Sequence, residues 1–539
     1  MTSDAIVPLN ALRGLGLATV FTLLTSTGCS SRNVEADPVV SVPGSVAEVP
    51  VAAPPAASPV DAASSGDTNT PSTAEPVRAK LDTTTTFQTW EGTGTSLAAW
   101  STEAREQYRS EQWQRLYLDD MGMTVLRVDL LPTPLYPDGK HATTAFRFGP
   151  DLDDNVAKLD YDRSPRAAIY GEVAQDLAAR GTTDGAGAQG LRILASVWTP
   201  PHFMKDGASI TNNGSDSAGG HLRMDRNNVA QYARYLAAAV TAWERRFGLP
   251  IYALSIQNEP RFEQPYSSMA ISPADYATVL AAVKAELTRQ GMSTKLFGPE
   301  DVGYGPEGDH SRIDAQLSFI RAVMEHPQAS SAMDAFAIHG YGGDGIDSRG
   351  YVAPGNWKYY WSNIEQYGRP TWQTESGGGP PQGMGPVYFA NVIFEGMSYG
   401  QISLWCNWMF SQAKPLDQHS LVGFDLNTDH PKYAVAKHFF RYIRPGARRI
   451  AVEPFDVDGV RLVAWQAPEG GPLTVVLINL RDQAAPVEVD LAEAGRDRLL
   501  RRYQTSVAGS FAELAALPVD GPLRLQLPPT SLTTLSDVK

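Results

Sequence analysis

Eight short apolar runs alternate with longer helical stretches between residues 94 and 408, and this alternation constrains the fold more than any other feature. The predicted strands are Gly94–Ala98, Thr124–Leu130, Arg192–Trp198, Tyr252–Gln257, Lys295–Gly298, Ala335–His339, Thr371–Thr374 and Ile402–Trp408. The stretches between them repeat apolar residues at three- and four-residue spacing, most clearly over Val229–Phe247. The pattern predicts an α/β fold, the (β/α)8 TIM barrel. An open doubly wound sheet is the alternative, but no glycine-rich phosphate loop follows an early run.

Two glutamates follow predicted strands where a barrel carries its active site. Glu259 ends the fourth strand in Gln-Asn-Glu-Pro, and Glu375 ends the seventh in Gln-Thr-Glu-Ser. Glycosidic cleavage needs a carboxylic acid to protonate the departing oxygen and a carboxylate to attack the anomeric carbon. We therefore predict Glu259 as general acid/base, with a pKa raised by burial and by the nearby charge of Glu375, and Glu375 as nucleophile. One Asn-Glu-Pro alone would more often hold a capping or surface glutamate, so the prediction depends on the pair.

Other residues at the strand ends complete the predicted site. Arg127 on the second strand is expected to neutralise and orient Glu375, and Asn258 to bond the sugar 2-hydroxyl. The remaining candidates for substrate binding are Trp198, His339, Tyr341, Trp405 and Trp408. Structural roles stay open for His339, as a hydrogen-bonded wall residue, and for Asp129, as an ion-pair partner of Arg127.

Charge and cysteine usage exclude several classes of function. The formal net charge is −14, which argues against nucleic acid as a partner because phosphate binding relies on clustered Lys and Arg. With two cysteines, Cys29 and Cys406, the chain cannot hold zinc through several thiolates. No two histidines show a ligand spacing on one helix or strand. We expect no metal and no cofactor, a polysaccharide or oligosaccharide substrate, and a monomer.

The first 80 residues predict export and a tether. Leu15–Leu24 is an apolar run of signal-peptide length, too short to span a bilayer, and small residues then lead to Cys29. We predict a lipoprotein-type signal over 1–28, lipidation of Cys29 and an outer-membrane or cell-surface location, with membrane contact only through the lipid. An ordinary secretory signal is the alternative, since Ser26 stands where lipoprotein signals usually have Leu. Residues 29–80, rich in Pro, Ala, Ser and Thr, are predicted to be a disordered linker.

Three motifs resemble glycoside hydrolase family 30, a family of retaining barrel glycosidases. They are Ser196–Pro201 (followed by Met204 and Lys205), Ser255–Pro260 and Thr374–Ser376. The resemblance covers roughly Phe87 to the C-terminus and implies that Glu259 is the acid/base and Glu375 the nucleophile. It also implies active-site positions for Arg127, Trp198, Asn258 and His339.

The C-terminal part is predicted to form a side domain. Short alternating runs with turns, such as Val460–Gln466, Leu473–Asn479, Val487–Val489 and Leu523–Leu527, predict a β-sandwich. We assign 81–445 to the catalytic barrel and 446–539 to this side domain, to which Leu81–Thr86 could add a strand. The resemblance implies the same arrangement, with Phe440–Ala447 as the link.

The substrate is inferred from the resemblance alone. Trp90–Trp100 is most similar to the opening motif of the family's endo-β-1,6-galactanase branch, although Ala99 stands where that branch usually has a second aromatic residue. We therefore expect cleavage of β-1,6-galactan side chains. The alternatives are another family specificity (β-1,6-glucanase, xylanase or glucosylceramidase-like) and a surface glycan-binding lipoprotein without catalysis.

Overall fold

The structure, a computed structural model, describes residues 75–99, 101–135, 147–181, 190–206, 220–262, 266–303, 308–341, 354–377, 387–412, 419–507 and 509–538. These residues belong to one compact unit, Ser64–Lys539. The predicted signal segment, Cys29 and the linker as far as residue 74 lie outside the described residues. Within the described ranges, no helix is both long and apolar enough to cross a membrane.

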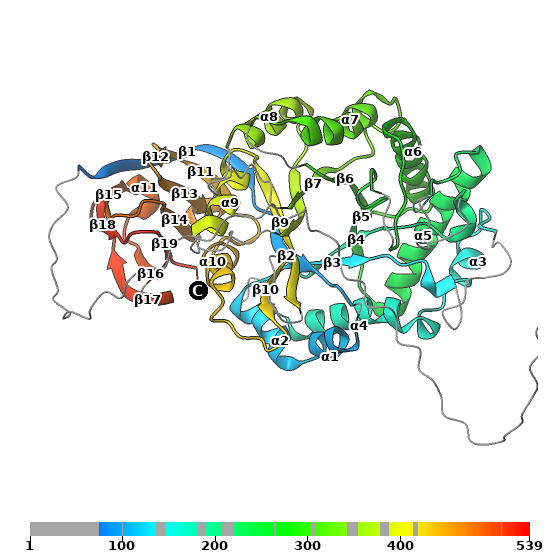
Figure 1. Cartoon of the computed structure of the whole chain (residues 1–539), viewed down its shortest axis with the longest axis horizontal. Coiled ribbons are helices and arrows are strands. Elements are labelled where there is room, and N and C mark those ends of the chain that lie inside the picture. The colour runs from blue at the N-terminus through cyan, green and yellow to red at the C-terminus, as the bar shows by residue number, and fades with distance from the viewer. Residues whose placement is uncertain are drawn as a thin grey trace, which may run out of the picture. The chain divides into compact units, whose positions relative to one another are not determined.

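Eight parallel strands form a closed barrel, which confirms the predicted fold (Figure 1). They are β2 (Gly92–Ser96), β3 (Val125–Asp129), β4 (Arg192–Ser196), β5 (Ile251–Ser255), β6 (Lys295–Val302), β7 (Ala335–Tyr341), β8 (Thr371–Gly377) and β9 (Ile402–Gln412). Each strand pairs with the next, and β9 pairs with both β8 and β2, which closes the ring. A further parallel strand, β10 (Ser420–Gly423), pairs with β9.

Helices surround the barrel strands (Figure 1). They are α1 (Thr102–Tyr108), α2 (Glu111–Arg115), α3 (Leu152–Val156), α4 (Pro165–Arg180), α5 (Arg226–Phe247), α6 (Pro273–Arg289), α7 (Ser311–Glu325), α8 (Pro354–Ile364), α9 (Val387–Ser398) and α10 (Pro431–Phe440). Helix α5 shows how the sequence sets their ends. The side chain of Asp225 accepts from the backbone N–H of Asn228, and Gly248 ends the helix with φ +69°.

The barrel interior is packed rather than hollow. Its core consists of Val125, Leu194, Ala253, Phe297, Ala335, Ala337, Trp372, Leu404 and Cys406, all buried. Gly94 allows β2 to approach β3, because a Cβ atom there would lie 2.0 Å from the carbonyl oxygen of Val125. A filled interior leaves the carboxyl ends of the strands as the place where side chains can meet a ligand.

The C-terminal strands form a mixed β side domain around a second apolar core. They are β11 (Arg448–Glu453), β12 (Asp456–Val457), β13 (Val460–Gln466), β14 (Leu473–Asn479), β15 (Ala485–Asp490), β16 (Leu499–Ser506), β17 (Gly509–Pro518), β18 (Leu523–Leu527) and β19 (Ser531–Ser536), with the short helix α11 (Ala492–Gly495). The hydrogen-bonded order is β17-β16-β19-β14-β13-β11-β1-β15-β18, with β12 paired to β13, so the strands form one continuous mixed sheet.

An early strand completes this sheet. Strand β1 (Val77–Thr89) pairs antiparallel with β11 and parallel with β15. Residues 77–80, which we assigned to the linker, are the first part of it. The reason is a period of two: Val77, Ala79 and Leu81 are buried while Arg78 and Lys80 are exposed.

Candidate active site

Glu259 lies in a sharp turn immediately after β5. Its φ is +44°, a left-handed conformation that is uncommon for a residue with a side chain and is often found at functional sites. The turn is held by two backbone hydrogen bonds: Asn258 donates to the Val197 carbonyl at 2.7 Å, and Glu259 donates to the Glu300 carbonyl at 3.1 Å. The side chain of Glu259 is 15% exposed, so its carboxyl group can reach a ligand.

Glu375 lies within β8, opposite His339 of β7. The register between the two strands shifts just before this pair, between Ile338 and His339, which brings both side chains to the same end of the barrel. The side chain of Glu375 is 4% exposed. This side chain has left bulk water almost completely and depends on polar neighbours to stay ionised.

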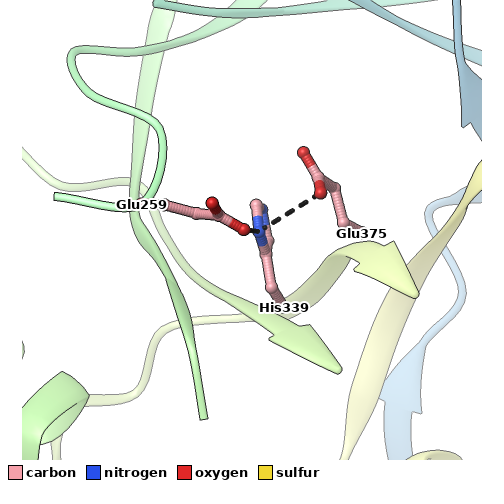
Figure 2. Close-up of side chains that lie close together, drawn as sticks. All are labelled: Glu259, His339 and Glu375. Atoms are coloured by element: carbon pink, nitrogen blue, oxygen red, sulfur yellow. Dashed lines mark hydrogen bonds and ion pairs between the residues drawn. The ribbon is translucent and has the colours of Figure 1, made fainter. Parts of the chain in front are cut away.

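His339 stands between the two glutamates (Figure 2). Its Nδ1 lies 3.1 Å from Oε1 of Glu259 and 3.5 Å from Oε2 of Glu375. One carboxylate oxygen of each glutamate and a ring nitrogen of His339 all lie within 4.8 Å of one another. The predicted pair therefore meets at one point, delivered by β5 and β8 from separate parts of the barrel.

Arg127 of β3 organises the other side of the site. Its guanidinium donates to Glu375 at 2.5 Å, to the side-chain oxygen of Asn258 at 2.7 Å and to Ser96 at 3.0 Å. Because Asn258 accepts through its oxygen, its NH2 group is the one that can donate to a sugar hydroxyl. Arg127 is fully buried and also lies 4.8 Å from the ring centre of Trp198. The predicted pairing of Arg127 with Glu375 is present.

Glu300 is a site residue that the sequence analysis missed. It lies near the end of β6, fully buried, with Oε1 3.1 Å from Nε of Arg127 and 3.7 Å from Nε2 of His339. We ended that predicted strand at Gly298, two residues before Glu300 and four before its observed end at Val302. Glu259 and Glu375 were predicted by looking for an acid at the carboxyl end of a barrel strand. The same rule would have identified Glu300 if the predicted strand had extended to its observed end.

The charges of the cluster shift two pKa values. Burial raises the pKa of Glu300, but the opposing charges of Arg127 and His339 outweigh it and lower the pKa to about 2. Burial lowers the pKa of His339, but the carboxylates of Glu375, Glu259 and Glu300 raise it to about 9. At neutral pH the imidazole is therefore protonated: Nδ1 lies within hydrogen-bond distance of Glu259, and Nε2 lies 3.7 Å from the carboxylate of Glu300.

Aromatic side chains near the cluster fall into two groups. The rings of Trp198 and Trp408 are partly exposed and 6.2 Å apart, as expected of residues that contact a substrate. Tyr266, which the sequence analysis did not select, is close enough that the charges of Glu259 and Glu375, after burial, raise its pKa. Its loop follows Glu259, but no local pattern marks it. The side chain of Tyr341 lies outside the described residues.

The structure contradicts the predicted role of Trp405 in substrate binding. We expected it beside Trp408 in the subsite, but it is fully buried and packs against Gly396 of α9, where a Cβ atom would lie 2.8 Å from its ring. Its neighbours Leu404 and Cys406 belong to the barrel interior. Because side chains alternate along a strand, Trp405 must face the helix layer instead.

The cluster could be considered as a metal site, since Glu259, His339 and Glu375 offer three converging ligand atoms. Its electrostatics favour another use. The guanidinium of Arg127 already neutralises Glu375, and His339 is hydrogen-bonded to Glu259. The arrangement suits proton transfer and nucleophilic attack: a carboxyl group with solvent access faces a buried carboxylate that a cation keeps charged.

Comparison with known proteins finds relatives of low identity. No protein-family model matches the chain. The chain is 23% identical to the glucuronoxylanase XynC of Bacillus subtilis (strain 168) over 373 residues, which cover 66% of this chain and 75% of the relative. A stretch of 149 residues, 26% of this chain and 29% of the relative, is 28% identical to the endo-1,6-beta-D-glucanase of Neurospora crassa.

Solved structures share the fold over most of the chain. The glycoside hydrolase family 30 subfamily 8 xylanase Xyn30A from Clostridium acetobutylicum superposes with a TM-score of 0.63 at 21% identity, covering 85% of this chain and 99% of its own. The endo-beta1,6-glucanase BT3312 gives 0.56 at 15% identity, covering 86% and 96%. The chain is therefore similar to xylanases and β-1,6-glucanases of glycoside hydrolase family 30. Its similarity to the galactanase branch stays a prediction.

Proposed function

We propose that this chain is a retaining glycoside hydrolase of family 30 that cleaves β-linked polysaccharides. The observation that carries the proposal is the approach of Glu259 and Glu375, whose nearest carboxylate oxygens lie within 4.8 Å of one another. Retaining glycosidases hold their two carboxyl groups about 5–5.5 Å apart, whereas inverting enzymes need about 6.5–9.5 Å to admit a water molecule. The short separation supports double displacement through a covalent intermediate.

In the first step, Glu375 attacks the anomeric carbon and Glu259 gives its proton to the departing glycosidic oxygen. The bond to the leaving sugar breaks as the glycosyl ester of Glu375 forms. In the second step, Glu259, now a carboxylate, takes a proton from water, and the hydroxide attacks the anomeric carbon and releases Glu375. Arg127, 2.5 Å from Glu375, stabilises the carboxylate before attack and after release.

The finer substrate proposal is β-1,6-galactan, supported by the resemblance of Trp90–Trp100 to the galactanase branch. A β-1,6-glucan is the second candidate, since two of the relatives are β-1,6-glucanases. Xylan is a third, since the longest curated match reported above is a glucuronoxylanase. We also propose that residues 1–28 direct export and that Cys29 is lipidated, which intact mass measurement of the protein from its native membrane would test.

A substrate screen with product analysis tests the proposal. Purified protein is incubated with β-1,6-galactan, β-1,6-glucan, glucuronoxylan and aryl β-glycosides, and the anomer formed first is recorded by NMR. We expect hydrolysis with net retention, and the preferred polymer identifies the substrate. An inverted first product would exclude the mechanism, and binding without hydrolysis would instead favour a glycan-binding protein.

A further inference from the structure

Glu300 touches both cations of the active site without reaching the substrate side. Its carboxylate lies 3.1 Å from Arg127 and 3.7 Å from His339, and it is fully buried. Its backbone carbonyl accepts from the N–H of Glu259 at 3.1 Å, and its φ is +55°, so the chain bends sharply here as it does at Glu259. Two residues with positive φ, Glu259 after β5 and Glu300 within β6, are joined by this hydrogen bond, which holds the acid/base and the third carboxylate in fixed relation.

The geometry around His339 fixes its protonation. Nδ1 faces carboxylate oxygens of Glu259 and Glu375, and Nε2 faces a carboxylate oxygen of Glu300. Carboxyl oxygens thus lie close to both ring nitrogens, and the negative charges of Glu375 and Glu300 favour the protonated, cationic form of the ring. Without Glu300, the imidazolium would lose one of its counter-charges.

Counting charges shows what Glu300 contributes to the proposed reaction. Before the first step, Arg127 and His339 are positive, Glu300 and Glu375 are negative, and Glu259 is a neutral acid. In the glycosyl-enzyme, Glu375 is a neutral ester and Glu259 has become negative. These five residues therefore have no net charge in either state, and this neutrality depends on Glu300, a carboxylate that never takes part in bond making.

We infer that Glu300 is a positioning residue whose permanent negative charge pairs with Arg127, keeps His339 cationic and holds the active-site cluster of Arg127, Glu259, Glu300, His339 and Glu375 neutral through both steps. The inference rests on the proposed function. Neutrality matters because the transition state is oxocarbenium-like and develops positive charge at the sugar. A cluster with a surplus positive charge would oppose that charge in a low-dielectric site and slow both steps.

In the part of the chain that the structure describes, several charged or titratable groups face or interact with Glu300 and enter the expected pH effect. Arg127 and His339 lie next to the Glu300 carboxylate, and Glu259 and Glu375 lie on the other side of these two cations. Tyr276 of α6 and Cys406 of β9 interact with Glu300 electrostatically. The neighbouring residue Asp301 is paired with Arg261. Replacing Glu300 by a neutral side chain makes deprotonation of both Glu259 and His339 easier. Both changes move the alkaline limb of the activity profile to lower pH.

The test compares Glu300→Gln with Glu300→Asp and a matched control. Glu300→Gln keeps the shape and removes the charge; Glu300→Asp keeps the charge. The control is Glu286→Gln on α6, the same substitution at a carboxylate that also accepts from an arginine, Arg289 at 2.6 Å, outside the site. For each folded variant, kcat and KM are measured from about pH 4 to pH 10, a range that spans the ordinary pKa values of Glu and His.

We expect Glu300→Gln to lower kcat by about 10- to 100-fold with KM nearly unchanged, and to move the alkaline limb down by about one pH unit. Glu300→Asp should restore the wild-type pH profile, and Glu286→Gln should match wild type throughout. A Glu300→Gln profile that overlays wild type overturns the inference, as does an equal shift in Glu300→Asp. An inactive wild type would instead reject the proposed function.

A second measurement needs neither activity nor a folded Glu300→Gln. The nine histidines are followed by NMR of imidazole nitrogens in the wild-type protein, with His339→Gln to assign the signal. We expect His339 to be doubly protonated at pH 7 and to lose its second proton only well above the ordinary pKa of histidine. A neutral His339 ring at pH 7 overturns the inference.

Discussion

The guanidinium of Arg127 lies 2.5 Å from the carboxylate of Glu375, and neither side chain is more than 4% exposed. The two residues are 248 positions apart in the chain. Removing one partner of such a buried pair leaves an unpaired charge, which costs about 3–5 kcal/mol, so the pair constrains both folding and chemistry. Since the same guanidinium also holds Asn258 and Glu300, it fixes the position of the nucleophile relative to the acid/base.

Arg127→Lys tests whether activity needs the several hydrogen bonds of the guanidinium as well as its positive charge. Lysine keeps one positive charge but cannot contact Glu375, Asn258, Ser96 and Glu300 together. We expect kcat/KM to fall by about 100-fold or more because the nucleophile is no longer held in line with the anomeric carbon. Steady-state kinetics on the best substrate measures this, with thermal unfolding to verify the fold. Wild-type kinetics in a folded Arg127→Lys would contradict it.

Glu375→Gln should abolish turnover while leaving the protein folded. The amide cannot form the glycosyl ester, and we expect a loss of at least about 10⁴-fold in kcat. Glu375→Ala opens a space beside the anomeric carbon, and azide should enter it and restore partial turnover of an aryl glycoside. Product NMR should then show a glycosyl azide of inverted configuration. Near-wild-type hydrolysis by either variant would remove the nucleophile assignment.

Glu259→Gln should separate substrates by their leaving groups. Without its proton donor the enzyme cannot assist an alkoxide, but a dinitrophenolate departs unaided. We expect hydrolysis of polysaccharide to fall by about 100- to 10,000-fold. The first step on a dinitrophenyl glycoside should change far less, so that glycosyl-enzyme accumulates and appears as a burst. Equal losses on both substrates would argue against Glu259 as the acid.

The sequence predicted the barrel because strand and helix periods are local properties. Each of the eight predicted runs has the length of a strand and contains alternate or consecutive apolar residues, and each contributes to a strand of the parallel barrel. The two glutamates followed from the same frame, since a barrel brings strand ends to one rim. The roles of Glu259 and Glu375 remain predictions, although the structure places them together.

What the sequence did not reveal depends on small offsets. Glu300 was missed because the strand continues through a register shift between Pro299 and Asp301, and such irregularities leave no pattern in composition. Trp405 was misplaced because successive side chains along a strand point to opposite faces of the sheet. An error of one residue in the assumed alternation moves a side chain from one face to the other. Both errors arise from register, which non-local pairing sets.

Trp198 and Trp405 form a matched pair for testing that correction. Trp198→Ala removes a ring from the rim, so KM should rise several-fold, equivalent to about 1 kcal/mol of lost stacking, with little change in stability. Trp405→Ala removes a buried ring, so the unfolding free energy should fall by about 3–5 kcal/mol while KM stays near wild type. Kinetics and thermal unfolding of both variants decide this. A raised KM in a folded Trp405→Ala would restore Trp405 to the subsite.

The protonation of His339 should make stability decline at alkaline pH. Its pKa rises from 6.5 to about 9 in the folded state, so the imidazolium contributes fully below pH 6.5 and its contribution is lost as pH rises through 9. At 1.36 kcal/mol for each pKa unit, the loss is about 3 kcal/mol at most. Urea unfolding midpoints at pH 6, 7.5 and 9 measure it, and His339→Gln should flatten the dependence. Parallel pH curves for the two proteins would show that His339 is neutral in the fold.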